Sequence, residues 1–173
     1  GVDTKYFVAK KKEKVAVLEA EIQELEESGQ EVENEEKPFI FLLIARLLYD
    51  KGILEYIEAI KILRENNPKV QFQLLGKIDA DKGLGISREI VNVWEREGLI
   101  TYLGRVDDVR STIQNADCVV LPSYREGTPR TLLEAASMSK PLLTTDVAGC
   151  REVVQHDLNG LLCLPKNAQD LAN

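Results

Sequence analysis

Histidine, cysteine and long apolar runs are all scarce in this chain, and each scarcity excludes a class of protein. The 173 residues include one His and three Cys, and Cys118, Cys150 and Cys163 do not have the spacing of a zinc site. We therefore expect reduced, buried cysteines in a cytoplasmic protein, with no metal bound through them. Because the sequence has neither a signal peptide nor eighteen consecutive apolar residues, it predicts no membrane span and no export.

Excess positive charge is also missing. The chain carries 22 Lys and Arg against 29 Asp and Glu, a net charge of −7. Residues 10–37 hold ten Glu and five Lys, a net of −5, which leaves −2 for residues 38–173 and zero for residues 1–9. Nucleic-acid binding requires a basic stripe. A nearly neutral body with an acidic appendage therefore predicts no nucleic-acid partner.

The charged segment and the rest of the chain have different patterns. Val15, Leu18, Ile22 and Leu25 recur at spacings of three and four, which predicts a charged helix over residues 10–29. A polar stretch follows as far as residue 37. We interpret residues 1–37 as a connector with a charged helix and residues 38–173 as one globular domain, because 44% hydrophobic residues supply a substantial core.

From Pro38 onward, apolar runs typical of strands alternate with amphipathic segments typical of helices. This alternation predicts an open parallel sheet of about six strands with helices on both faces, a Rossmann-like α/β fold. The expected strands are Phe39–Ala45, Val70–Leu75, Ile100–Leu103, Cys118–Leu121, Pro141–Thr145 and Leu161–Cys163. The expected helices are Lys51–Asn66, Ser87–Glu97, Val109–Asn115, Arg130–Met138 and Cys150–Gln155.

Two carboxylates, Glu126 and Glu134, lie on either side of an expected strand-to-helix turn. Thr128 and Pro129 between them predict a helix start, with Thr as the N-cap and Pro as the first helical residue. The free amides of such a helix start, together with two acidic groups, form a plausible cradle for a sugar and its phosphates. The alternative is that Glu134 lies on the solvent side of an amphipathic helix and Glu126 merely occupies a turn.

The segment Glu126–Glu134 resembles the Glu-x7-Glu signature of retaining glycosyltransferases of family 4, which have the two-domain, double-Rossmann (GT-B) architecture. Further motifs occur in the same order along residues 38–173. They include Ala45-Arg46-Leu47 with Lys51-Gly52, Gly104-Arg105-Val106, Pro122-Ser123, Leu133-Glu134-Ala135, Thr144-Thr145-Asp146 and Asn159-Gly160-Leu161-Leu162. One departure is Ser139-Lys140, where the family usually has Gly before Pro141.

The resemblance implies a role for each candidate residue. Arg46 and Lys51 would hold the diphosphate of a nucleotide-sugar donor without a metal, because charged donors stabilise the leaving group. Glu134 would accept the ribose hydroxyls, and Glu126 would face the transferred sugar as the candidate catalytic residue. Substrate-binding roles are also expected for the amides of Gly127 and Thr128, for Arg105 near phosphate and for Val106 near the base.

The resemblance further implies the function and its partners. We expect the donor-binding, C-terminal domain of a glycosyltransferase that uses a nucleoside diphosphate sugar, most simply UDP-linked, in bacterial polysaccharide or lipid-linked glycan synthesis. The N-terminal domain would be absent, so the chain alone would be inactive. A lipid-linked acceptor would bring the complete enzyme to the inner face of the membrane. Two alternatives are a sugar-nucleotide epimerase of the same architecture and a non-catalytic interaction module.

Overall fold

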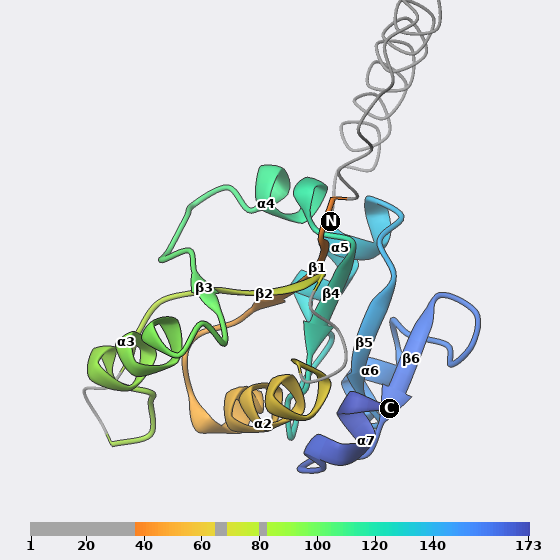
Figure 1. The fold of residues 1–173 in the computed structure, drawn as a ribbon. Helices are drawn as coiled ribbons and strands as arrows, with labels where there is room; N and C mark the ends of the chain where they lie inside the picture. Colours follow the sequence, from red (N-terminus) through yellow and green to blue (C-terminus); the bar gives the residue numbers. More distant parts are fainter. Residues whose placement is uncertain (1–36, 65–68, 80–82) are drawn as a thin grey trace, which may run out of the picture.

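An open sheet of six parallel strands, in the order β3-β2-β1-β4-β5-β6, is the framework of the domain (Figure 1). The computed structural model describes residues 37–64, 69–79 and 83–173. The charged helix expected over residues 10–29 lies outside the described residues. The strands are β1 (Phe39–Ile44), β2 (Val70–Leu75), β3 (Thr101–Tyr102), β4 (Cys118–Leu121), β5 (Leu142–Thr145) and β6 (Gly160–Cys163).

Helices follow the strands in turn, as the alternating sequence pattern predicts. They are η1 (Tyr49–Lys51), α2 (Ile53–Arg64), α3 (Arg88–Arg96), α4 (Arg110–Asn115), α5 (Arg130–Ser137), α6 (Ala148–Arg151) and α7 (Ala168–Ala172). Figure 1 shows α2 and α7 on one side of the strands and α4 and α5 on the other. None of the helices in the described ranges is long and apolar enough to cross a membrane.

The sheet is buried on both faces because the central strands are apolar at every position. In β1, Leu43 faces the core under α2 and α3, whereas Leu42 and Ile44 face the core under α4 and α5. In β4, Val120 belongs to the first core and Val119 to the second, and both side chains are buried. Side chains alternate along a strand, so a continuous apolar run requires helices on both faces. The predicted fold class is thereby confirmed.

The helix expected from Lys51 is divided at its first turn. Gly52 separates η1 from α2 with a left-handed backbone, φ +68°. A Cβ at this position would also lie 2.0 Å from the Pro122 carbonyl oxygen, so the end of β4 approaches too closely for a side chain. Lys51 therefore belongs to a separate short turn that sits against the chain leaving β4.

The end of β4 is fixed from its other side by hydroxyl groups of β5. The Thr144 hydroxyl donates to the Leu121 carbonyl at 2.6 Å, and the Thr145 hydroxyl donates to the Ser123 carbonyl at 2.5 Å. Both threonines are buried. Strands β1 and β4 are neighbours in the sheet but not in the sequence. The reversal of strand order between them is the position at which open α/β sheets bind ligands, beyond the carboxyl ends of the strands.

Candidate functional site

Lys51 and Glu126 form an ion pair beyond the carboxyl ends of β1 and β4, where the strand order reverses; we call this place the switch point. The Lys51 ammonium donates to Glu126 Oε1 at 2.7 Å, and the two side chains are only 17% and 15% exposed. Lys51 comes from η1, after β1, and Glu126 comes from the loop between β4 and α5. The two residues were predicted for one site but for different parts of a ligand, and the sequence did not predict their direct contact. An ammonium has three donors, so one bond to Glu126 leaves capacity for an anionic ligand.

The loop that carries Glu126 is held by close contacts to the start of α6. A Cβ on Gly149 would lie 1.9 Å from the Gly127 carbonyl oxygen and 2.4 Å from that of Glu126. Such distances exclude any side chain at position 149, so this glycine is required by packing. Gly127 and Thr128 remain exposed. Their backbone is therefore accessible from solvent at the place where the sequence predicted a ligand.

The predicted cap of the following helix is wrong by one residue. Pro129 is the N-cap, in the extended region at φ −76° and ψ 116°, and α5 begins at Arg130. The Thr128 side chain instead donates its hydroxyl hydrogen to the Glu152 carboxylate beyond α6. Thr128 consequently ties the loop to the α6 segment and does not satisfy the first amides of α5.

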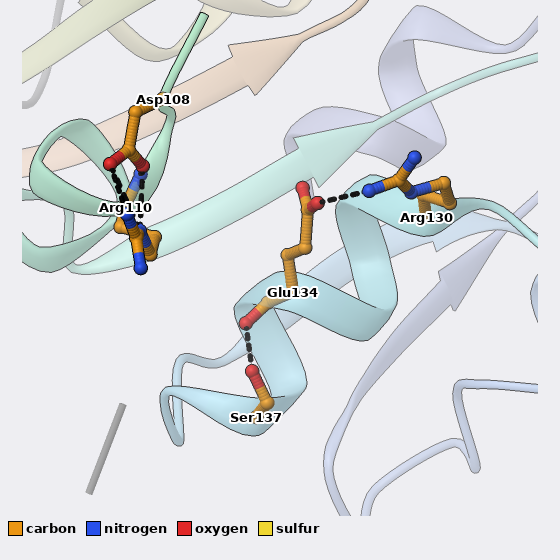
Figure 2. A network of polar contacts seen from close by, with 5 residues as sticks. All are labelled: Asp108, Arg110, Arg130, Glu134 and Ser137. Carbon is orange, nitrogen blue, oxygen red and sulfur yellow. Dashed lines mark hydrogen bonds and ion pairs between the residues drawn. The ribbon is translucent and has the colours of Figure 1, made fainter. Parts of the chain in front are cut away.

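Glu134 lies on α5 with its carboxylate partly shielded and with a cation beside it. Its side chain is 20% exposed, and Oε1 is 3.4 Å from a guanidinium nitrogen of Arg130 one turn earlier, as Figure 2 shows. Arg130 itself is 86% exposed. The structure therefore does not support the alternative that Glu134 lies on the solvent side of its helix. The sequence alone did not predict the ion pair of Glu134 with Arg130.

Arg46 and Arg105 lie beyond the carboxyl ends of β1 and β3, and both are solvent-accessible. Arg46 is 3.7 Å from Asp79, and Arg105 is 3.2 Å from Asp107. Val106 is also exposed. Exposed ion pairs at such positions are weak and exchange readily for other anions. Both guanidinium groups are therefore accessible to a phosphate, although neither has Glu126 as its ion-pair partner.

The three cysteines are free and buried, as expected from the sequence. Burial raises the pKa of Cys118 to about 12 and that of Cys163 to about 11. Burial also raises the pKa of Cys150, against the opposing effect of hydrogen bonds with Thr144 and Thr145. Thiols with such pKa values are not nucleophiles at neutral pH. Within the described ranges, no group of three His, Cys, Asp or Glu side chains is placed to hold a metal ion.

A large apolar cavity of about 690 Å³ lies between α2, α7 and the face of the sheet that they cover. It is lined by strand residues such as Phe41 and Cys118, together with α2 and α7 residues such as Ile60 and Leu171. His156 and Asp170 are the titratable side chains besides tyrosine and cysteine in its wall. A cavity with no Lys or Arg among its described lining residues does not suit a diphosphate, so the candidate site is the charged edge around Lys51 and Glu126.

The doubly wound sheet, with cations and carboxylates gathered beyond the carboxyl ends of its strands, defines a nucleotide-binding type of α/β domain. The chain belongs to the glycosyl transferases group 1 family, because the sequence model of that family matches residues 11–173. The fold and the family agree with the predicted C-terminal GT-B domain. They also confirm the predicted glycosyltransferase class.

Known relatives and structures show the same similarity. The N,N'-diacetylbacillosaminyl-diphospho-undecaprenol alpha-1,3-N-acetylgalactosaminyltransferase of Campylobacter jejuni is 37% identical over 139 residues, 80% of this chain and 35% of that protein. Anabaena HepE, solved in complex with UDP-glucose, is 28% identical with a TM-score of 0.68, over 79% of this chain and 37% of HepE. The chain thus spans about a third of these relatives.

A third similar structure consists of a domain alone. It is the C-terminal domain of the glycosyl transferase group 1 family protein LpcC from Francisella tularensis, 25% identical with a TM-score of 0.67. The match covers 80% of this chain and 75% of that domain. The similarity therefore concerns a unit that has been crystallised without the remainder of its protein.

Proposed function

We propose that this chain is the donor-binding domain of a retaining family 4 glycosyltransferase that uses a UDP-linked sugar. The observation that carries this proposal is the Lys51–Glu126 ion pair at the switch point between β1 and β4. It joins a phosphate-binding type of cation to the first carboxylate of the Glu-x7-Glu signature. The UDP-glucose complex of HepE supports the choice of donor.

The diphosphate would be bound by Lys51 and Arg46. Lys51 is oriented by Glu126 at 2.7 Å, so its remaining donors have a restricted direction. Arg46, which is 64% exposed, offers a planar set of donors that can leave Asp79 for a stronger phosphate contact. Negative charge grows on the diphosphate as the sugar departs. Two cations therefore stabilise the transition state more than the bound donor.

The nucleoside would be bound by residues of α5 and of the loop after β3. Glu134 would accept hydrogen bonds from the two ribose hydroxyls, which suits a carboxylate whose side chain is mostly shielded but still 20% exposed. Arg105 would approach a phosphate from the end of β3, and the exposed Val106 would contact the base. The amides of Gly127 and Thr128 would donate to the sugar or the β-phosphate.

Glu126 would face the transferred sugar. A carboxylate near the anomeric carbon stabilises the positive charge that develops there as the glycosidic bond to phosphate breaks. Retention of configuration is part of this proposal, since the acceptor would then attack from the face that the diphosphate leaves.

The acceptor would bind mainly to a second domain that precedes this one in the complete protein. In this proposal, residues 1–37 connect the two domains and residues 38–173 bind the donor. A lipid-linked acceptor, as named for the Campylobacter relative, would place the complete protein in the cytoplasm at the inner face of the membrane. The product would belong to a surface polysaccharide or a lipid-linked glycan.

A donor titration tests the proposal directly. Isotope-labelled chain is titrated with UDP-glucose, GDP-mannose and ADP-glucose, and amide chemical shifts are followed. We expect saturable shifts with the UDP sugar, centred on η1 and on the loop from Pro122 to Pro129. Absence of binding to all three donors would favour the interaction module. Formation of a free UDP-sugar isomer without acceptor would favour the epimerase.

A further inference from the structure

Tyr124 connects three segments beside the ion pair, and none of the roles assigned above includes it. Its backbone N–H donates to the Asp50 carbonyl of η1 at 2.9 Å. Its hydroxyl donates to Glu55 Oε1 of α2 at 2.7 Å. The Lys166 ammonium, from the loop before α7, lies 4.7 Å from the centre of its ring. A cation over a tyrosine ring is attracted by the ring's negative face.

Tyr124 precedes Glu126 by two residues, and its hydrogen-bond partners lie on either side of Lys51 in the sequence. Asp50 precedes Lys51 in η1, and Glu55 lies in the first turn of α2, beyond the break at Gly52. The two bonds of Tyr124 therefore fix the β4–α5 loop against both sides of Lys51. A displacement of Tyr124 would move Glu126 away from the ammonium that it contacts.

Glu55 has a feature that general packing does not explain. Its Oε2 atom is buried, and within the described residues it has no hydrogen-bond partner. A buried carboxylate oxygen without a donor lowers the stability of the fold. The hydrogen bond from Tyr124 to the other oxygen of Glu55 offsets part of this loss. Burial, followed by the nearby Glu55, raises the pKa of Tyr124 to about 12. The phenol consequently remains a hydrogen-bond donor throughout the neutral range.

We propose that Tyr124 is a positioning residue that holds Glu126 opposite Lys51 by anchoring the β4–α5 loop to η1 and α2. This inference rests on the proposed function, because the position of Glu126 matters only if Glu126 acts on the donor sugar. Lys166 restrains the ring from outside and links the β6–α7 loop to the same anchor. Tyr124 does not itself touch the donor.

The first test needs no ligand. Tyr124→Phe keeps the ring but removes the hydroxyl, and we expect hydrogen exchange of the residue-124 amide, which donates to the Asp50 carbonyl, to rise about tenfold, the effect of one hydrogen bond to a charged group. Glu55→Gln keeps an acceptor oxygen but loses the charge, so it should raise exchange less than Tyr124→Phe does, whereas Glu55→Ala should resemble Tyr124→Phe. The control is Tyr56→Phe, which removes a hydroxyl bonded at 3.1 Å to the Phe41 carbonyl in the core. Unchanged exchange in Tyr124→Phe would overturn the anchor.

The second test is a double-mutant cycle on ligand affinity. Tyr124→Phe should leave the affinity for UDP unchanged and lower that for UDP-glucose, because only the sugar meets Glu126. The same substitution should have no further effect in Glu126→Gln, since a residue that acts through Glu126 loses its influence when Glu126 is replaced. Additive effects, or equal weakening of UDP and UDP-glucose, would overturn the positioning role. If the wild type bound neither ligand, the proposed function would fail, while the exchange test would still decide the anchor.

Discussion

Lys51 and Glu126 are 75 positions apart in the sequence, and their charged atoms are 2.7 Å apart in the structure. The pair depends on two close backbone approaches, of Gly52 to Pro122 and of Gly149 to Gly127. Each approach brings the loop after β4 onto a neighbouring element, η1 in one case and α6 in the other. The Lys51–Glu126 ion pair therefore depends on Gly52 and Gly149, because a side chain at either position would push the loop after β4 away.

Lys51→Ala should weaken UDP binding about ten- to a hundred-fold and leave uridine binding nearly unchanged. A charged hydrogen bond to phosphate contributes roughly 1.5–3 kcal/mol, and uridine has no phosphate. Isothermal titration of both ligands measures the difference. Lys61→Ala is the matched control, because Lys61 also pairs with a glutamate at 2.7 Å but lies on the exposed face of α2. Equal weakening of UDP and uridine by Lys51→Ala would contradict the diphosphate assignment.

The two glutamates should respond differently to the loss of charge. Glu134→Gln should weaken UDP binding, because the ribose belongs to UDP. Glu126→Gln should leave UDP affinity nearly unchanged and, in the complete transferase, lower the rate of transfer. Affinity for UDP and turnover with a UDP-sugar are the two measurements. A similar loss of UDP affinity in both variants would contradict this division between ribose and sugar.

Gly149→Ala should destabilise the domain by roughly 1–3 kcal/mol, the usual cost of overpacking. The new Cβ would meet the Gly127 carbonyl oxygen at 1.9 Å, so α6 and the loop after β4 must separate. Urea unfolding measures the loss. Gly127→Ala is the control for stability, since a Cβ there has no heavy atom within 4 Å. A stable Gly149→Ala variant with wild-type UDP affinity would show that the loop tolerates displacement.

The cysteines should be unreactive while the domain is folded. Burial raises the pKa of Cys118 to about 12 and that of Cys163 to about 11, so both remain thiols at pH 8. A raised pKa means that the folded state favours the protonated form, and the associated stability is lost as pH rises from about 9 toward these values. Titration with a thiol-specific disulfide reagent at pH 8 should label no cysteine in buffer and all three in urea. Rapid labelling in buffer would contradict their burial.

The fold was predictable because its signals are local. The run from Cys118 to Leu121 is apolar at each position, and such a run predicts a strand covered on both faces. The side-chain contacts were less predictable, because they depend on packing between distant segments. Thr128 bonds to Glu152 and not to its own helix, and Tyr124 reaches Glu55 on α2. The one signal for the latter was a polar residue in the predicted ligand loop, which does not identify a partner.

His156 illustrates the same limit. The helix expected over Cys150–Gln155 would place His156 at its C-terminal end, but α6 ends at Arg151. His156 Nδ1 instead accepts a hydrogen bond from the Leu162 N–H at 3.0 Å, on β6 at the edge of the sheet. An unpaired strand edge exposes such amides, and a side-chain acceptor satisfies one of them. His156 thus satisfies an amide of a strand, a role that the expected helix end does not predict.

The last prediction concerns what this chain does alone. We expect it to fold and to bind UDP or a UDP-sugar weakly, in the high micromolar to millimolar range, about 4–6 kcal/mol of binding free energy. The crystallised C-terminal domain of the Francisella relative supports independent folding. Sugar transfer should be undetectable, because closure of two domains is needed to align the acceptor and exclude water.

The measurement is a transfer assay on the purified chain with UDP-glucose and a lipid-linked saccharide acceptor, with and without Mg²⁺ or Mn²⁺. Binding is followed in the same preparation, so that a lack of turnover is not confused with a lack of folded protein. Addition of the divalent ions should not produce turnover, since Arg46 and Lys51 are proposed to neutralise the diphosphate. Measurable transfer would show that the acceptor site lies within these 173 residues. The proposed separation of donor and acceptor between two domains would then be wrong.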